Sequence, residues 1–368
     1  MRSIGLIGMI FWTGIVAVLS QSVAVTNTEM VCGVEEERHS YLFALFSVLP
    51  IILWAGFRTE RGYVNTNAYI RFYSTIPNTF GEVIQYIRNV NDSDWGFTLL
   101  TWLIKQVFGA SYTPYLFIIA LVQCTIVAFF FRKYSSNYSM SFFLFVASAE
   151  YFSWIFNGMR QFLAVVITLT AFKYLLDKQY IKYVLIVLIA STIHMTAIIM
   201  LPLAFVVQGK PWNKKTLLII ALALFAIVYT SQFTHLIDAS VQNTQYSESI
   251  SSWEDNGSNP IRVLFYSIPT VFSLLAINKI ESDDNAVINV CVNMSIVSSA
   301  LWLISMVTSG IYIGRLPIYV GLYNYVLYPY LIENYFDDIT NAQIAEFLMI
   351  VVYLVYYYYQ IHIAWNAI

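Results

Sequence analysis

Charged residues are scarce in this sequence of 368 residues: they make up 11% of the chain, against roughly 25% in an average soluble domain. Hydrophobic residues reach 59% and aromatic residues 17%. A chain with so few charges does not fit an ordinary water-soluble fold. The composition therefore predicts an integral membrane protein.

Cysteine and the motifs of metal and nucleotide chemistry are also lacking. The three cysteines, Cys32, Cys124 and Cys291, lie far apart and form no CxxC pair, so neither a disulfide framework nor a zinc site is indicated. No DxD, HExxH, GxSxG or P-loop pattern occurs. The net charge of −2 comes without a long basic run. We therefore expect no cofactor, no metal and no nucleic-acid partner.

Apolar stretches long enough for a helix to cross the hydrocarbon core recur along the chain. They predict an all-α polytopic membrane protein with about 11–13 membrane segments in a single domain, residues 1–368. His194 interrupts the apolar stretch 180–207, which predicts a hairpin with arms 180–193 and 195–207. The other expected spans are 4–25, 41–57, 112–131, 140–157, 161–177, 216–234, 261–278, 286–308, 316–332 and 343–361.

The segments between these spans set the expected topology. The N-terminal stretch resembles a signal peptide, but its cleavage would place most lysines outside, so we expect an uncleaved first helix. Residues 96–110 are amphipathic and too short to span, and we place them at the outer interface. The largest outer loops, about 58–95 and 233–260, are rich in Asn, Ser, Thr and Tyr, which suits sugars as well as water.

Lysine and arginine are distributed unequally over the two sides. Eight of the nine lysines lie in or beside turns that we assign to the cytoplasm, as the positive-inside rule expects. Eight of the ten arginines lie outside, among them Arg58, Arg160 and Arg315 at helix ends. Because a guanidinium binds phosphate bidentately, these three predict a phosphorylated substrate at the outer surface. The acidic segment 26–40 opposes this topology, but acidic residues contribute little to the rule.

Two interpretations are open for each candidate residue. Arg160 begins a helix, whose dipole repels a cation, so it serves either a ligand or an acidic neighbour such as Glu150. Arg58 and Arg315 are interfacial anchors or phosphate ligands. His194 is a packing residue or a general base, since an imidazole ordinarily titrates near about pH 6.5.

Five short motifs occur in the order found in the EpsG family of Wzy-type polysaccharide polymerases, and the chain resembles that family over residues 41–335. The motifs are Gly56-Phe57-Arg58 with Asn65-Thr66 and Tyr69, Gly96-Phe97, Asn157-Gly158-Met159-Arg160-Gln161, His194-Met195-Thr196-Ala197 followed by Leu201-Pro202, and Gly314-Arg315 with Tyr319. Asn65 departs from the pattern, since the family usually has Asp there.

The resemblance implies a metal-independent glycosyltransferase with a GT-C-like architecture and broken helices near the outer face. It would lie in the bacterial plasma (inner) membrane, with an active site that faces the outside or periplasm. Its substrates would be undecaprenyl-pyrophosphate-linked oligosaccharide units, polymerised into a capsule, O-antigen or exopolysaccharide. Expected partners are the bilayer, a chain-length regulator and a flippase.

The resemblance also implies roles for the candidate residues. Arg160 and Arg315 would bind the leaving pyrophosphate, and Arg58 would contact the second lipid-linked unit or close the site. His194 would deprotonate or orient the acceptor hydroxyl, while Glu150 would orient Arg160 or act as a base.

We expect Asn65, Tyr69 and Gln161 to contact the sugars. A flippase or transporter of lipid-linked oligosaccharide is an alternative, and an O-antigen ligase-type glycosyltransferase is another.

Overall fold

The computed structural model describes residues 2–22, 26–31, 34–59, 65–229, 257–310 and 312–364. The chain divides into two compact units, one of Met1–Pro202 with Phe336–Ile368 and one of Leu203–Tyr335. The expected single domain stays a prediction. Most of the predicted loop 233–260, and part of the loop 58–95, lie outside the described residues.

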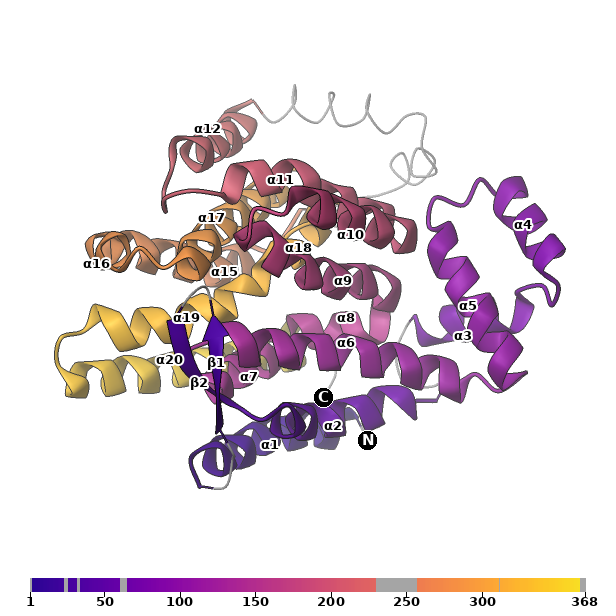
Figure 1. Cartoon of the computed structure of the whole chain (residues 1–368), viewed down its shortest axis with the longest axis horizontal. Helices are drawn as coiled ribbons and strands as arrows, with labels where there is room; N and C mark the ends of the chain where they lie inside the picture. Colours follow the sequence, from indigo (N-terminus) through magenta and orange to yellow (C-terminus); the bar gives the residue numbers. More distant parts are fainter. Residues whose placement is uncertain are drawn as a thin grey trace. The chain divides into compact units, whose positions relative to one another are not determined.

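Helices make up nearly all of the described chain (Figure 1). The first unit contains α1 (Arg2–Ser22), β1 (Thr26–Val31), β2 (Val34–His39), α2 (Tyr41–Gly56), α3 (Thr66–Thr75), α4 (Phe80–Asn89), α5 (Trp95–Phe108), α6 (Thr113–Tyr134), α7 (Tyr138–Ala147), α8 (Glu150–Asn157), α9 (Met159–Leu176), α10 (Tyr180–Ile193), η1 (Met195–Ile199), α20 (Ile339–Tyr359) and η3 (Gln360–Ala364). Helix α11 (Met200–Val207) begins in the first unit and ends in the second. The second unit continues with α12 (Lys214–Val228), α15 (Pro260–Leu275), α16 (Ile277–Asp283), α17 (Ala286–Val307), η2 (Ile313–Arg315), α18 (Ile318–Gly321) and α19 (Tyr323–Tyr335).

The predicted polytopic helical architecture is confirmed. Within the described ranges, five helical segments are long and apolar enough to cross a membrane: α1, α6, α9, α17 and α20 with η3. Two bent pairs, α7 with α8 and α15 with α16, raise the count to seven. Helices α2 and α10 and the segment Met195–Val207 are apolar but shorter. The GT-C-like arrangement and the larger segment count stay predictions.

Helix breaks follow the sequence in one place and depart from it in another. The predicted break at His194 is confirmed: α10 ends at Ile193, and His194 is extended, with φ −153° and ψ 118°. The expected span 140–157 is not one straight helix, because the chain bends by 65° between α7 and α8. Ala149 adopts φ 58° there, a left-handed conformation that neither glycine nor proline marks in the sequence.

Helix α6 is the central element of the first unit. Its small buried residues Ala120, Cys124 and Ala128 recur every fourth position, on one face, and are at most 1% exposed. Small residues let neighbouring membrane helices approach closely, and α6 packs against both α2 and α9. With 22 residues, α6 is about 33 Å long, which matches the thickness of the hydrocarbon core.

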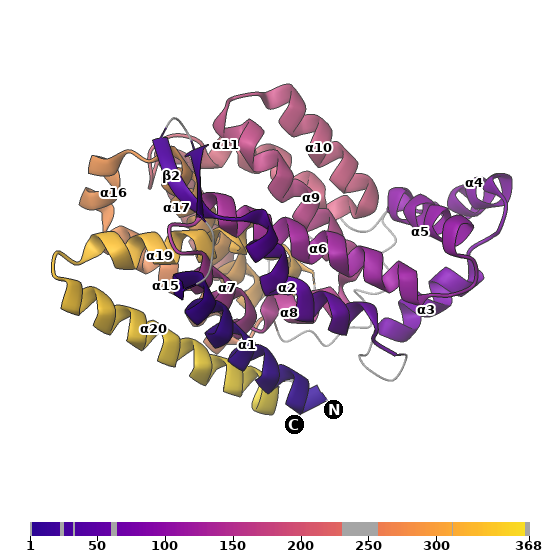
Figure 2. The same cartoon turned by 60° about the horizontal axis from the view of Figure 1, so that its bottom comes forward.

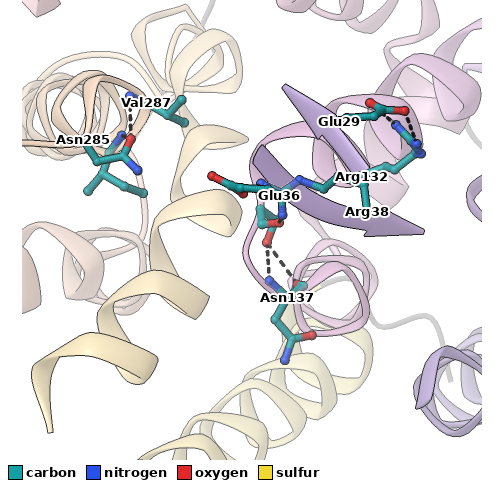
Figure 3. Close-up of polar contacts among 9 residues, drawn as sticks. Glu29, Glu36, Arg38, Arg132, Asn137, Asn285 and Val287 are labelled. Atoms are coloured by element: carbon teal, nitrogen blue, oxygen red, sulfur yellow. Dashed lines mark hydrogen bonds and ion pairs between the residues drawn. The ribbon is translucent and has the colours of Figure 1, made fainter. Parts of the chain in front are cut away.

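The acidic segment 26–40, expected as a loop, forms the antiparallel hairpin β1–β2. Arg132, near the end of α6, attaches the hairpin to the helices (Figure 3). Its Nη1 donates to Glu29 at 2.9 Å, its Nε donates to the carbonyl of His39, and its guanidinium lies 3.6 Å from the ring centre of Tyr41. Arg38 donates to the Ser135 carbonyl at 2.8 Å. Because the hairpin contacts the 132–139 turn directly, these two segments lie on the same side, as the topology requires.

The two ends of α6 carry different structures. Tyr115, in its first turn, stacks on Tyr73 of α3 at 4.9 Å and lies 6.4 Å from Phe97 of α5. Figures 1 and 2 show α3 to α5 at one end of α6 and the hairpin at the other. Helix α6, which is long and apolar enough to cross a membrane, separates these two regions.

The second unit is held together by buried polar side chains. Thr270 of α15 lies 2.6 Å from the hydroxyl of Ser295 and 2.7 Å from that of Ser299, both on α17. Asn293 of α17 donates to the carbonyls of Val207 and Lys210, which orders the turn between α11 and α12. In an apolar surrounding each such bond satisfies groups that would otherwise be costly to bury.

We expect the variant Arg132→Gln to lower the free energy of unfolding by about 3 kcal/mol, because it leaves Glu29 without its charged partner. Thermal unfolding in detergent measures this loss. Lys133→Gln is the matched control, since the neighbouring lysine acts on Glu29 only through its charge and makes no hydrogen bond to the hairpin among the described residues. Equal stability of the two variants would contradict the anchoring role of Arg132.

Candidate functional site

The break after α10 creates a polar position within an apolar region. His194 lies between α10 and η1, and the free N–H groups of a helical start follow it directly. The first of these groups, the Met195 N–H, donates to Asp94 Oδ1 at 2.8 Å. The acceptor that satisfies this start therefore comes from another part of the chain.

Asp94 stands at the N-cap position of α5, yet its side chain does not cap its own helix. Asp92 stabilises that end instead: it accepts hydrogen bonds from the Asp94 N–H at 3.0 Å and from the Thr98 hydroxyl at 2.5 Å. Aspartate at this position ordinarily caps its own helix. The Asp94 side chain instead points to the start of η1, which indicates a role other than capping α5.

The Asp94 carboxylate joins the two strongest candidates from the sequence. Its Oδ2 lies 2.8 Å from His194 Nδ1 and 3.1 Å from Arg160 Nε. The Asp94 side chain is 1% exposed, and that of His194 is 10% exposed. We call Asp94, Arg160 and His194 the carboxylate cluster.

Opposing effects act on the Asp94 carboxyl. Burial raises its pKa, but the hydrogen bond with His194 and the positive charge of Arg160 lower it more, so the net shift is downward. Asp94 is thus an anion at neutral pH, and its charge is balanced by Arg160. Without such partners a buried carboxylate would be strongly unfavourable.

Arg160 contacts the rest of the protein through only part of its guanidinium group. It lies in the first turn of α9, directly after the break that follows α8, and its side chain is 40% exposed. Asp94 engages Nε, and the Phe97 ring centre lies 6.0 Å from the guanidinium carbon. Among the described residues, neither terminal nitrogen has a hydrogen-bond partner. Arg160 therefore keeps one bidentate edge for a ligand.

Gly96 brings Asp94 to the cluster. A Cβ on Gly96 would lie 2.2 Å from the hydroxyl oxygen and 2.9 Å from the carbonyl oxygen of Thr192, in the last turn of α10. No side chain fits at that distance. The start of α5 can therefore contact the end of α10 only because residue 96 is glycine.

Arg58, by contrast, is fully engaged and 6% exposed. Its Nε donates to the Thr66 hydroxyl at 3.2 Å, Nη1 to the Ala55 carbonyl at 2.7 Å and Nη2 to the Met159 sulfur at 3.2 Å. Arg58 thus fixes the end of α2 beside the residue that precedes Arg160. The expected ligand edge of Arg58 is occupied by the protein.

The predicted sugar-binding residues surround the same helix breaks. Asn65 donates to the Asn157 carbonyl at 2.8 Å, and Tyr69 lies 6.3 Å from the Phe97 ring. Gln161 is 4% exposed and donates to the Thr196 hydroxyl at 3.4 Å, which ties α9 to η1. Asn65 is exposed, whereas Gln161 is buried and part of the framework.

Glu150 and Arg315 are the remaining candidate residues from the sequence. Glu150 as the acidic partner of Arg160 is wrong, because Asp94 makes that ion pair and Glu150 accepts a hydrogen bond from Trp154 Nε1 at 2.8 Å. Arg315 ends the 3-10 turn η2 of the second unit and is exposed, so its place beside the other arginines stays a prediction.

Asp94 is the residue that the sequence did not identify. The available signal was its position two residues before Gly96-Phe97, one of the five motifs. Within the described ranges, no group of three or more His, Cys, Asp or Glu side chains could hold a metal ion.

The carboxylate cluster combines a partly exposed cation with a histidine whose second nitrogen remains available. Among the described residues, His194 Nε2 has no hydrogen-bond partner. It does not belong to the fully buried polar atoms that lack a partner, so a ligand can reach it. Such a pair can bind an anion and exchange a proton beside it.

Comparison with known protein families gives a match over most of the chain. The sequence model of the EpsG family matches residues 41–366, which is nearly the whole chain. No curated protein and no solved structure matches.

We expect Gly96→Ala to lower the free energy of unfolding by about 1–3 kcal/mol, because the new methyl group overlaps Thr192. Gly81→Ala is the control, since its Cβ would meet no atom within 4 Å. Thermal unfolding in detergent compares the two. A neutral Gly96→Ala variant would show that the close contact of α5 with α10 is not required.

Proposed function

The chain belongs to the EpsG family, and on that premise we propose that it polymerises lipid-diphosphate-linked oligosaccharide units at the outer face of the plasma membrane. Members of this family are Wzy-type polymerase-like membrane proteins. The single observation that carries the proposal is the carboxylate cluster, in which one buried carboxylate orders an arginine and a histidine side by side.

The proposed reaction is a glycosyl transfer. A hydroxyl oxygen of one unit attacks the anomeric carbon of the growing chain, and a new glycosidic bond forms. The bond from that carbon to the diphosphate oxygen breaks, and its electron pair stays on the diphosphate. The hydroxyl proton passes to a base, so the products are a longer chain, a lipid diphosphate and a proton.

Arg160 suits the leaving diphosphate. Its Nε is held by Asp94, which fixes the plane of the guanidinium and leaves the two terminal nitrogens for phosphate oxygens. Negative charge grows on the diphosphate as the bond breaks. A cation aimed there therefore stabilises the transition state more than the bound substrate, which is the condition for catalysis.

His194 suits the base. Its Nδ1 faces Asp94, and Nε2 is the nitrogen left to accept the hydroxyl proton. The cluster is compact, since Arg160 and His194 share one carboxylate oxygen. Acid–base chemistry and leaving-group stabilisation would thus occur within a single small region.

The outer face is supported by charge and by position. The carboxylate cluster lies with α5 near the start of α6, and the hairpin and the Arg132–Lys133 turn lie at the other end. Positive turns belong to the cytoplasm, so the cluster belongs outside. An outer site would receive units after their transfer across the membrane, which makes a flippase a natural partner.

The remaining arginines have different proposed parts. Arg58 is proposed to position the start of α9 rather than to bind substrate, since all three of its nitrogens are bound within the protein. Arg315 stays a candidate for diphosphate binding on the sequence argument alone. Asn65 and Tyr69 are proposed to contact sugars, because Asn65 contacts the break before Arg160 and Tyr69 lies against Phe97, whose ring is beside the Arg160 guanidinium.

Deletion of the gene should leave lipid-linked oligosaccharide as single units on the outer leaflet and abolish the ladder of longer chains. Gel analysis of lipid-linked glycans, with accessibility to an added glycosidase in intact cells, gives both answers. Single units trapped inside would identify a flippase. A persistent ladder that fails to reach its final acceptor would identify a ligase.

Arg160→Ala should abolish long chains at normal protein abundance, with a loss of at least about 100-fold, as for removal of an oxyanion donor. Arg160→Lys should recover little, because one ammonium group cannot pair with Asp94 and bind a phosphate edge together. Arg71→Ala, an exposed arginine on α3, is the control and should polymerise normally. Full polymerisation by Arg160→Lys would refute the bidentate role.

A further inference from the structure

We infer that Asp94 is the positioning residue of this site: it fixes which nitrogen of His194 carries the proton and thereby makes Nε2 the base. Asp94 lies outside the five motifs that the chain shares with the EpsG family. The inference rests on the proposed function for its catalytic consequence, but the proton position can be measured without any reaction.

The hydrogen-bond pattern determines the donor. An ionised carboxylate only accepts hydrogen bonds, so His194 Nδ1, 2.8 Å from Oδ2, must carry the proton. In a neutral imidazole the other nitrogen then holds a lone pair. Asp94 thus selects the tautomer in which Nε2 can take a proton from a hydroxyl.

Asp94 is itself held in place from three directions. The Met195 N–H fixes Oδ1, while Arg160 and His194 both face Oδ2. When Nε2 accepts a proton, the imidazolium lies against the carboxylate and its charge is stabilised there. The proton then leaves to water or to the released diphosphate.

Substitution by asparagine has a defined consequence. The Met195 N–H is a backbone donor that cannot move away, so the amide oxygen takes the Oδ1 position and the amide NH₂ takes the Oδ2 position. Arg160, whose side chain is 40% exposed, can turn from the NH₂ toward water. An N–H donor would then face His194 Nδ1 and force its proton onto Nε2. Asp94→Asn is thus expected to reverse the His194 tautomer and to release Arg160, whose Nε would face the same amide N–H donor.

The first measurement is nitrogen-15 NMR of the full chain in lipid, labelled at its four histidines, at a pH where the imidazole is neutral. The His194→Gln spectrum identifies the His194 signals by their loss. We expect protonated Nδ1 in the wild type and protonated Nε2 in Asp94→Asn. Protonated Nε2 in the wild type overturns the inference, and this outcome needs no folded Asp94 variant.

The second measurement is a double-mutant cycle on the initial rate of chain elongation, in vesicles supplied with lipid-diphosphate-linked oligosaccharide. Asp94→Asn should lower the rate by at least about 100-fold in the wild type, but by less in the His194→Gln background, where the loss of the Arg160 ion pair remains and the effect on the His194 tautomer is absent. Equal fold-losses in both backgrounds would identify a merely structural residue and overturn the inference.

Asp92→Asn is the matched control, since Asp92 lies at the same helix start but bonds only the Asp94 N–H and Thr98. Any loss that it causes should be equal in both backgrounds. If the wild type elongates nothing, the proposed polymerase function fails. The NMR result then still decides the role of Asp94 in setting the tautomer.

Discussion

The buried carboxylate of Asp94 is the constraint on which the site depends. A carboxylate with 1% exposure is stable only if positive or donating groups surround it, and here they come from three segments: the Met195 N–H, His194 and Arg160. Each of these groups is itself at a helix break. The anion therefore holds together the ends of α5, α9 and α10, and the same contacts that stabilise the fold also orient the reactive groups.

Three further residues keep these helix ends in contact. Gly96 allows α5 to reach α10, Gln161 ties α9 to η1, and Arg58 fixes the end of α2 beside Met159. Non-helical backbone at membrane depth is tolerated only where protein or a water-filled cavity satisfies its polar groups. The break at His194 meets this condition, since Asp94 accepts the Met195 N–H that the break exposes.

Hydropathy located the long helices well because length and apolar content determine them: the expected spans 112–131 and 286–308 correspond to α6 and α17. It could not find the bend at Ala149, which depends on a left-handed residue without glycine or proline. It also missed the hairpin, whose charged strands depend on contact with Arg132. The arginines and His194 were visible at helix ends, whereas Asp94 was not, since its partner His194 is 100 residues away.

Two arginine–carboxylate pairs in the first unit show how a structural pair differs from one prepared for a ligand. Arg132 has no exposed side-chain surface, and all three of its nitrogens are bound, two by Glu29 and one by the His39 carbonyl. Arg160 pairs through Nε alone and keeps 40% of its side chain exposed. The protein thus provides hydrogen-bond partners for every nitrogen of Arg132. For Arg160, within the described ranges, it provides only the Asp94 carboxylate, which fixes the direction of the guanidinium. A partly satisfied cation beside an ordered histidine is stable only if water or an anion completes it, and a diphosphate is the anion whose geometry the free edge of Arg160 matches.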